Sequence, residues 1–225
     1  MLRIYECVAN DHDFQVLLLS LLLCFFSAST AVLMGQRAMA VGKRNELTWL
    51  FAAGVVTGIG IWTTHFSAML AFAPGTEIHF ESLHMAAALA FAVVVSIAGW
   101  IIGFGGKQNR PLLGGGIIGV ALTGSHYIDA FGLRFAGHLG MDLDLVVLSV
   151  VVGISLCAFA GHLLARHNLP GISFFASGAL ALGIIGLHLI AMAAVNLVAD
   201  PAVEIPATVF SLDIVGGWVL TSTLC

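Results

Sequence analysis

The sequence has very little charge. Only 8 of its 225 residues are lysine or arginine and 12 are aspartate or glutamate, whereas apolar residues make up 60% of the chain. A mean hydropathy of +1.05 is far above that of soluble globular domains, so the composition excludes a soluble protein. The formal net charge of −4 includes no polybasic run, so no nucleic-acid partner is expected, and the expected surroundings are a lipid bilayer.

Cysteine is also scarce. The four cysteines are Cys7, Cys24, Cys157 and Cys225, and none of them forms a Cys-x-x-Cys pair. This excludes a zinc ribbon and a dithiol redox motif. Cys24 and Cys157 fall within apolar stretches, where free cysteine usually packs as a small buried side chain.

Long apolar stretches dominate what is present. Seven of them approach the roughly 20 residues that a helix needs to cross a bilayer core about 30 Å thick. They are Phe14–Met34, Leu47–Phe72, Leu83–Gly103, Leu112–Leu133, Leu145–Ala165, Ile172–Val198 and Ala207–Cys225. The predicted fold class is therefore all-α integral membrane with seven transmembrane helices.

The distribution of basic residues predicts the orientation of these spans. Basic residues near span ends resist translocation and mark the cytoplasmic side. Six of the eight lie between spans one and two, three and four, or five and six: Arg37, Lys43, Arg44, Lys107, Arg110 and Arg166. We therefore expect a multi-pass protein of the bacterial cytoplasmic membrane, with its N-terminus outside and its C-terminus in the cytoplasm.

The chain contains a repeat of about sixty residues. The stretches GIGIWTTHFSAMLAF, GVALTGSHYIDAFGL and ALGIIGLHLIAMAAV align without gaps on His65, His126 and His188, which are separated by 61 and 62 residues. Each repeat is a pair of spans, so the fold is predicted to be three repeated helix pairs plus one extra helix. The second, fourth and sixth spans then run in the same direction and carry their histidines at the same depth, in the outer half of the membrane.

Small residues repeat together with the histidines. At eleven and seven positions before them lie Gly54 and Gly58, Gly115 and Gly119, and Ser177 and Ala181. These offsets place the small residues on the histidine face of each helix, and small residues let transmembrane backbones approach closely. The stripe is therefore predicted to pack the three helices against one another and to aim their imidazoles at one centre.

Ionisable side chains within a membrane are costly and usually mark a site, so three histidines in register predict a metal centre. Met69 and Met192 follow His65 and His188 by four residues, which puts each thioether on the same helix face as its imidazole. Imidazole and thioether ligands suit copper, above all Cu(I), and zinc is the second candidate.

The second repeat departs from this pattern, because Ala130 replaces the methionine and Asp129 lies where the other repeats have alanine. We expect Asp129 to hold an imidazole tautomer through a hydrogen bond, to be a direct ligand, or to lie at the outer membrane interface. Its carboxylate strengthens the case for zinc. His12, at the outer start of the first span, is a candidate additional ligand.

These stretches resemble the integral-membrane MHYT domain, whose motif Met-His-Tyr-Thr-Gly-Met recurs in alternate spans. The resemblance extends over the whole chain, including the start NDHDFQVLLLS and the segment APGTEIHFE after the second span. It assigns the motif histidines to His65, His126 and His188 and the trailing methionines to Met69 and Met192. Thr64, Ser125 and Leu187 replace the leading methionine, so at most three histidines and two thioethers are available.

The resemblance implies a bacterial sensory input domain that binds copper and thereby senses oxygen, carbon monoxide or nitric oxide. Residues 1–225 are expected to be a single such domain, cut from a longer protein with a cytoplasmic cyclic-di-GMP or kinase module in the same chain. The domain alone is then no enzyme, and a homodimer is compatible with this organisation.

Other function classes use similar residues. A seven-span membrane hydrolase holds zinc with three histidines and activates a water, which Asp129 or Ser125 would orient. Two of the histidines could instead hold haem, although three aligned imidazoles suit a small ion better. A transporter is less consistent with parallel repeats that lack broken helices.

Overall fold

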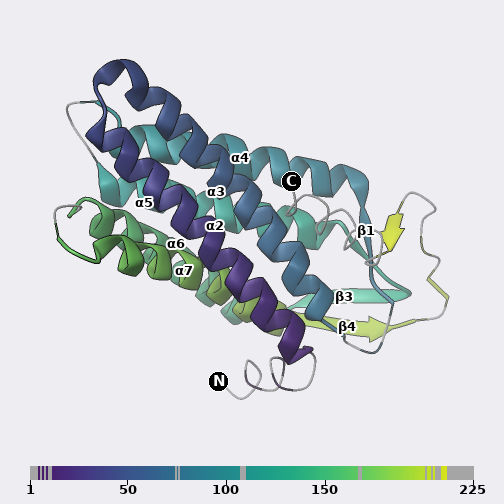
Figure 1. Ribbon diagram of the computed structural model, residues 1–225. Coiled ribbons are helices and arrows are strands. Elements are labelled where there is room, and N and C mark those ends of the chain that lie inside the picture. Colours follow the sequence, from purple (N-terminus) through teal and green to yellow (C-terminus); the bar gives the residue numbers. More distant parts are fainter. Residues whose placement is uncertain are drawn as a thin grey trace.

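The computed structural model describes residues 12–73, 75, 77–106, 110–166, 169–200 and 209–211, together with residues 5, 7, 9, 202, 203 and 205. Six long helices, labelled α2 to α7 in Figure 1, make up most of this part of the chain. They are α2 (Phe14–Ala40), α3 (Lys43–Ala71), α4 (Ser82–Phe104), α5 (Pro111–Phe131), α6 (Leu143–Leu164) and α7 (Ile172–Ala194). They correspond to the first six predicted spans.

Residues at the helix ends explain where several helices begin. The side chain of Asp13 caps α2 by accepting hydrogen bonds from the backbone amides of Gln15 and Val16, and Asp142 caps α6 in the same way through Asp144. Pro111 occupies the first turn of α5, where its missing amide proton costs nothing. Gly171, immediately before α7, has a φ of 74°, a conformation that favours glycine.

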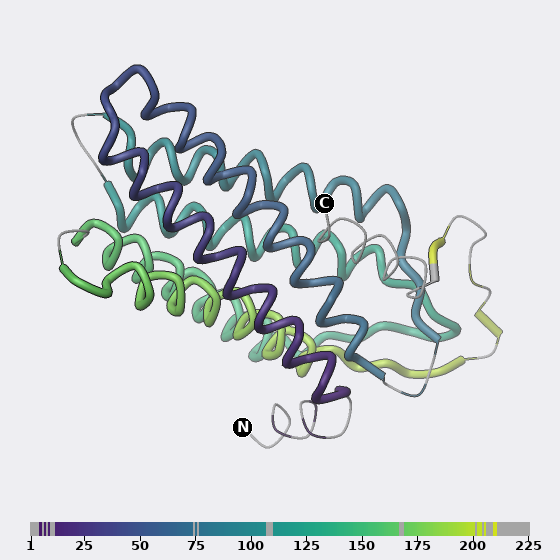
Figure 2. The backbone as a smooth tube through the Cα atoms, in the orientation of Figure 1, coloured from purple at the N-terminus to yellow at the C-terminus, as the bar shows by residue number. Residues whose placement is uncertain are grey.

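The helices form a closed ring in which each packs against its neighbour in the sequence and α7 packs against α2. In addition, α3, α5 and α7 contact one another, so these three helices form the centre of the bundle. The backbone trace in Figure 2 shows the helices running alternately up and down the bundle. This arrangement agrees with three repeated helix pairs, α2–α3, α4–α5 and α6–α7. The second helix of each pair is an inner helix.

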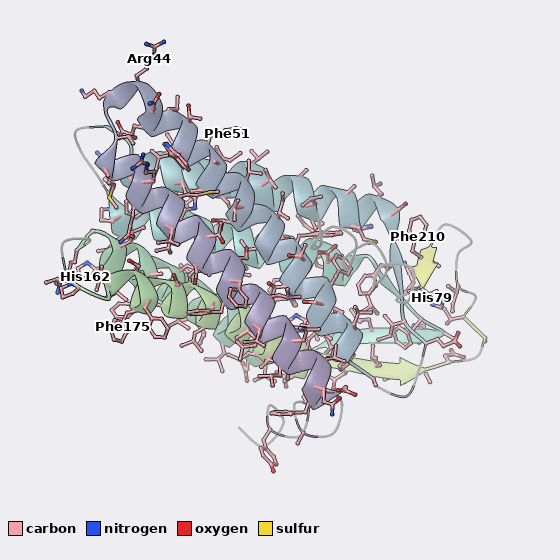
Figure 3. The ribbon with its side chains drawn as sticks, in the orientation of Figure 1. Arg44, Phe51, His79, His162, Phe175 and Phe210 are labelled. Atoms are coloured by element: carbon pink, nitrogen blue, oxygen red, sulfur yellow. The ribbon has the colours of Figure 1, made fainter. Side chains whose placement is uncertain are left out.

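Short strands lie at one end of the bundle (Figure 1). β1 (His79–Glu81) pairs with β2 (Leu133–Arg134) and β5 (Val209–Ser211), and β3 (Gly137–Met141) pairs with β4 (Val195–Ala199), all antiparallel. The basic connections lie at the other end, as Figure 3 shows for Arg44, whereas His79 and Phe210 lie at the strand end. The two ends of the bundle therefore differ in charge and in structure.

Five of the six helices are long and apolar enough to cross a membrane, namely α2, α3, α4, α6 and α7. The 21-residue α5 packs between α4 and α6 and carries five glycines together with Ser125, His126 and Asp129. Large apolar side chains such as Phe51 and Phe175 point away from the bundle, as expected for a surface that meets lipid (Figure 3). The chain is thus a multi-pass membrane protein.

Several predicted spans need correction. The first, Phe14–Met34, was predicted too short, because α2 continues to Ala40, and Leu133, predicted as the end of the fourth span, lies in β2. The span Ile172–Val198 was predicted too long, because the helix ends at Ala194 and the next residues form β4, which pairs with β3. The predicted seventh span is Ala207–Cys225. Within it, Val209–Ser211 form the strand β5, so the prediction of a helix is wrong for these three residues. The rest of that span lies outside the described residues, and the predicted count of seven stays a prediction.

The glycine stripe packs helices, although its predicted partners were wrong. A Cβ atom on Gly54 or Gly58 would meet the α4 backbone at Ile97 or Val93, and one on Gly119 would meet α6 at Ile154. The glycines of the stripe therefore join α3 to α4 and α5 to α6, and they do not join α3 to α5. Close approach requires small residues, but their spacing does not identify the partner helix.

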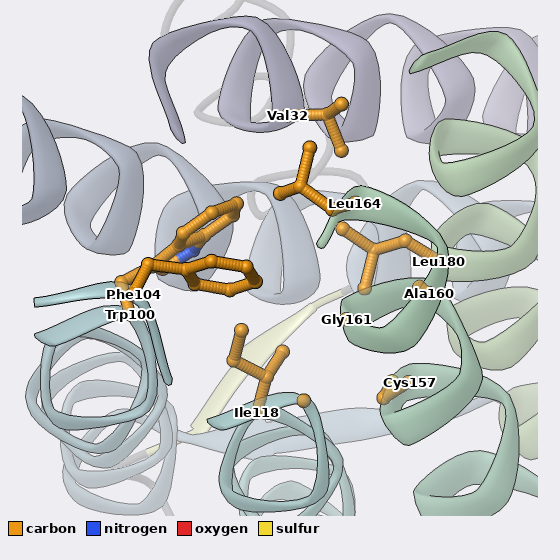
Figure 4. A pocket seen from close by; sticks show the side chains of 10 residues that line it. Val32, Trp100, Phe104, Ile118, Cys157, Ala160, Gly161, Leu164 and Leu180 are labelled. Carbon is orange, nitrogen blue, oxygen red and sulfur yellow. The ribbon is translucent and has the colours of Figure 1, made fainter. Parts of the chain in front are cut away.

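An apolar cavity of about 20 Å³ lies in the half of the bundle that carries the basic connections (Figure 4). Its wall includes Trp100 and Phe104 from α4, Ile118 from α5 and Leu164 from α6. The indole Nε1 of Trp100 donates a hydrogen bond to Thr57 Oγ1 at 2.8 Å, so its polar atom is satisfied away from the cavity. Such an apolar space is expected to stay dry.

Candidate metal centre

His65, His126 and His188 meet in the centre of the bundle. They are carried by α3, α5 and α7, the three inner helices, and their exposed fractions are only 6%, 3% and 2%. One ring nitrogen of each lies within 4.8 Å of those of the other two. The structure therefore brings together the three histidines that the repeat aligns.

The spacing of the imidazoles is close to that of ligands on one metal ion. His126 Nδ1 and His65 Nδ1 are 3.2 Å apart, and the three ring centroids are 4.9, 5.3 and 5.5 Å from one another. Two nitrogens bound at about 2.0–2.1 Å in a tetrahedral or trigonal site would be separated by roughly 3.3–3.6 Å. Small movements of the side chains would thus complete a three-nitrogen site.

Unsatisfied polar atoms give an independent test of the fit. Within the described part of the chain, neither ring nitrogen of His188 has a hydrogen-bond partner, and His65 Nε2 also lacks one. A buried polar atom left in this state costs about 1–3 kcal/mol. Neutral imidazoles are preferred ligands of copper and zinc, so these residues fit a bound ion of that kind.

A small cavity of about 10 Å³ lies between the histidines. Its wall includes Thr64 and Leu187, which directly precede His65 and His188. It is completed by Ile61, Leu122 and Ile184, each one helical turn before a histidine on the same helix. These residues occupy equivalent positions of the repeat, so the centre has an apolar layer on the side of the basic connections. A cavity of this size holds about one water molecule or one ion.

Met69 and Met192 lie one turn beyond the histidines, toward the strands. Both are buried, with exposed fractions of 1% and 4%, and both belong to an apolar cluster that also contains Phe66 and Phe80. They are not among the residues that line the histidine cavity. The structure therefore brings the two thioethers into one cluster beside the imidazoles, and their role as ligands stays a prediction.

Asp129 is fully buried on α5, two residues before the end of this helix. Its Oδ2 lies 3.9 Å from Nε2 of His65, and both of its oxygens lack a hydrogen-bond partner among the described residues. A role in holding an imidazole tautomer, a role as a direct ligand and a position at the depth of the outer interface therefore all stay predictions.

His12 is not a member of the group of three, although its buried Nε2 also lacks a hydrogen-bond partner among the described residues. Its Nδ1 lies 2.9 Å from the carbonyl oxygen of Cys7, and its ring packs against Phe72 at the end of α3 with centroids 5.2 Å apart. The side chain is buried, but the histidine group of the described residues does not include it. The structure thus places this candidate ligand between the start of α2 and the end of α3.

Sequence reasoning missed the strand that covers this end of the bundle. Phe80 on β1 is almost fully buried and packs edge-on against Phe66 and His65, with ring centroids 5.2 and 6.5 Å away. The flanking Glu81 pairs with Arg134 at 3.0 Å and with His84 at 2.8 Å. The segment EIHFE gave no signal for this, because three residues are too few to show strand periodicity.

Comparisons with known proteins agree with this architecture. The family MHYT, described as "Bacterial signalling protein N terminal repeat", matches residues 58–116 and 119–175. An "Uncharacterized signaling protein" of Caulobacter vibrioides is 25% identical over 216 residues, which cover 93% of this chain and 26% of that protein. No solved structure matches the chain significantly.

A second relative has a named activity. The "Bifunctional diguanylate cyclase/cyclic di-GMP phosphodiesterase MucR" of Pseudomonas aeruginosa is 28% identical over 182 residues, which cover 78% of this chain and 27% of the relative. The chain thus spans about a quarter of the length of the two curated relatives.

Proposed function

Since the chain belongs to the MHYT family of bacterial signalling proteins, we propose that it is a membrane sensory input domain built around an intramembrane copper centre. The observation that carries this proposal is the convergence of His65, His126 and His188 from equivalent positions of three helix pairs. Three buried imidazoles in a membrane protein are costly unless they serve a site.

Copper is the proposed metal. The three imidazoles would hold the ion, and Met69 and Met192 would offer soft thioether ligands from the strand side of the centre. When bound, copper supplies one-electron redox chemistry and affinity for small diatomic gases. The chain itself keeps bulk water away, because Ile61, Leu122 and Ile184 close one side of the cavity and the cluster around Phe80 covers the other.

Signal transmission would use the three inner helices. Because α3, α5 and α7 contact one another at the centre, a change in the spacing of the imidazoles changes the packing of all three. A ligand shifts such an equilibrium only if it binds the two arrangements with different affinity. A gas ligand of the metal meets this condition when its affinity depends on the spacing of the three imidazoles. Oxygen, carbon monoxide and nitric oxide are the proposed signals.

The output would be cytoplasmic. One relative is a diguanylate cyclase and phosphodiesterase, and this chain covers only about a quarter of it. We therefore place a cyclic-di-GMP enzyme in the same chain as the proposed partner, on the cytoplasmic side of the inner membrane. The basic connections between helices support the cytoplasmic assignment of that end of the bundle.

A zinc-dependent membrane hydrolase is the second candidate, and Asp129 is the observation that favours it. A carboxylate beside a three-histidine zinc site can orient an activated water. The cavity of about 10 Å³ is too small for a lipid amide together with that water, so the sensor is the stronger proposal.

Metal content tests the proposal. The protein is purified without a histidine tag, and bound metals are measured by mass spectrometry in the wild type, in His126→Ala and in the control His138→Ala, whose side chain is 73% exposed. We expect close to one copper per chain in the wild type and in His138→Ala and a loss of most copper in His126→Ala. Stoichiometric zinc would favour the hydrolase, and no metal in any of them would refute a metal centre.

A further inference from the structure

Asp129 is an unusual residue for the interior of a membrane protein. It lies three residues after His126 on α5, where the other two repeats have Ala68 and Ala191. Its exposed fraction is 0%, and in the described ranges neither carboxylate oxygen receives a hydrogen bond. A buried, unpaired carboxylate is expensive, so a partner of positive charge or a strong donor is expected beside it.

In the described ranges, no lysine or arginine forms a salt bridge with Asp129. Arg134, five residues further along the chain, donates to Glu81 and to the carbonyl oxygens of Phe131 and Leu133. The ion-pair contact that Asp129 makes is with His65, whose Nε2 lies 3.9 Å from Oδ2. The carboxylate is thus directed at the histidine centre.

The two nitrogens of His65 face different groups. Nδ1 lies 3.2 Å from Nδ1 of His126, inside the group of three, whereas Nε2 faces Asp129. This division leaves Nδ1 for a metal ion and Nε2–H as a donor to the carboxylate. Metal-bound histidines usually donate their second N–H to a carboxylate or a carbonyl in this way.

We propose that Asp129 is a positioning residue that sets the charge preference of the centre: when an ion is bound, its carboxylate closes the present 3.9 Å gap to His65 Nε2, accepts a hydrogen bond from Nε2–H and makes the site favour a divalent over a monovalent ion. This inference rests on the proposed metal centre. Three neutral imidazoles leave the full charge of the ion uncompensated in a medium of low dielectric constant, and one nearby carboxylate attracts a divalent ion more strongly than Cu(I). The thioethers of Met69 and Met192 act in the opposite sense, since they favour Cu(I).

The test measures Cu(II) and Cu(I) affinities of the purified protein by competition with chromophoric chelators. The variants are Asp129→Asn, which keeps the shape of the side chain, and Asp129→Ala, which restores the residue that the other two repeats carry. Asp144→Asn is the control, because it removes an acidic charge that is exposed in the first turn of α6. We expect Cu(II) affinity to fall by about 10–100-fold in both Asp129 variants, with a much smaller change for Cu(I) and none in the control.

Each other outcome has a distinct meaning. Equal losses of Cu(II) and Cu(I) affinity would assign Asp129 a structural role and overturn the inference, as would unchanged affinities in the Asp129 variants. A wild-type protein that binds neither ion would instead refute the proposed metal centre itself. The electron paramagnetic resonance spectrum of bound Cu(II) gives a second readout, because a changed hydrogen bond on His65 alters the ligand field, whereas a distant structural effect leaves it unchanged.

Discussion

The three central histidines have different surroundings although they occupy equivalent positions of the repeat. His65 contacts Phe66 and faces Asp129, and His126 packs against Tyr127, whose hydroxyl lies 2.6 Å from Ser149 Oγ. Both nitrogens of His188 lack a partner in the part of the chain that the structure describes. His65 is therefore the imidazole whose orientation its neighbours define best, and His188 is the one with most freedom to follow a bound ion.

At this scale, the sequence allowed the convergence of His65, His126 and His188 to be predicted, because a gap-free repeat places equivalent residues at equivalent depths. The burial of Asp129 could not be predicted, since a polar residue near the end of a span is equally compatible with the membrane interface. The pairing of Glu81 with Arg134 could not be predicted from the sequence either, because the two residues are 53 positions apart in the chain.

The methionines give a prediction at the residue scale. Replacing Met69 and Met192 together by leucine keeps the volume of the apolar cluster but removes both thioethers. If these sulfurs bind the metal, Cu(I) affinity falls by at least about tenfold while zinc affinity changes little. Met85→Leu is the control, because Met85 lies in the same buried cluster but does not follow a central histidine. Unchanged Cu(I) affinity in the double variant would identify both methionines as packing residues.

At the scale of helices and strands, close backbone contacts hold the pairs together. Gly115 on α5 lies against the carbonyl group of Cys157 on α6, and Gly103 on α4 lies against Gly114 on α5. These contacts position α5, the helix that carries His126. The glycines of α5 therefore matter for the site although none of them is part of it.

The helices were predictable within a few residues, because apolar runs and residues such as Asp13 and Pro111 mark their limits. β4 was missed because the apolar run of α7 continues into Val195–Ala199, and a short apolar segment does not distinguish helix from strand. Its pairing with β3 depends on residues 54 to 62 positions earlier in the chain, which no local pattern reveals.

Alanine substitutions at two adjacent glycines of α5, Gly115 and Gly116, test the close packing of α5 against α6. A Cβ at Gly115 would lie under 3.0 Å from Cys157 and Ala158, whereas nothing lies within 4 Å of one at Gly116. Gly115→Ala should therefore destabilise the protein by about 1–3 kcal/mol. Gly116→Ala should leave stability unchanged or raise it by up to about 1 kcal/mol, because alanine favours helix. Thermal unfolding in detergent measures both, and equal Tm values for the two variants would contradict the observed α5–α6 packing.

At the scale of the whole molecule, the bundle has two unlike ends. The connections α2–α3, α4–α5 and α6–α7 lie at the end marked by Arg44 and His162, and the strands lie at the other (Figure 3). The histidine centre lies nearer the strands, since each histidine is in the second half of its helix. The threefold organisation was predictable from the repeat. The predicted seventh span stays a prediction, because Val209–Ser211, which form a strand, are the only described residues of that segment.

Reporter fusions test the proposed orientation and the seventh span together. Six helices return the chain to its starting side, so a fusion after Asp200 should place the reporter outside and one after Leu169 should place it in the cytoplasm. A fusion after Cys225 should again be cytoplasmic if a seventh span exists. Green fluorescent protein reports the cytoplasm and alkaline phosphatase reports the outside. Phosphatase activity after Cys225 would limit the protein to six spans, and activity after Leu169 would invert the whole topology.

The most direct test of the central claim is X-ray absorption spectroscopy at the K-edge of the bound metal. The account predicts a copper edge with about three imidazole nitrogens at about 2.0 Å, and the loss of one imidazole from the fit in His188→Ala. In the same spectra, a longer sulfur contribution would be present in the reduced protein. A first shell made of oxygen or sulfur alone, or an identical spectrum in His188→Ala, would contradict a metal held by His65, His126 and His188.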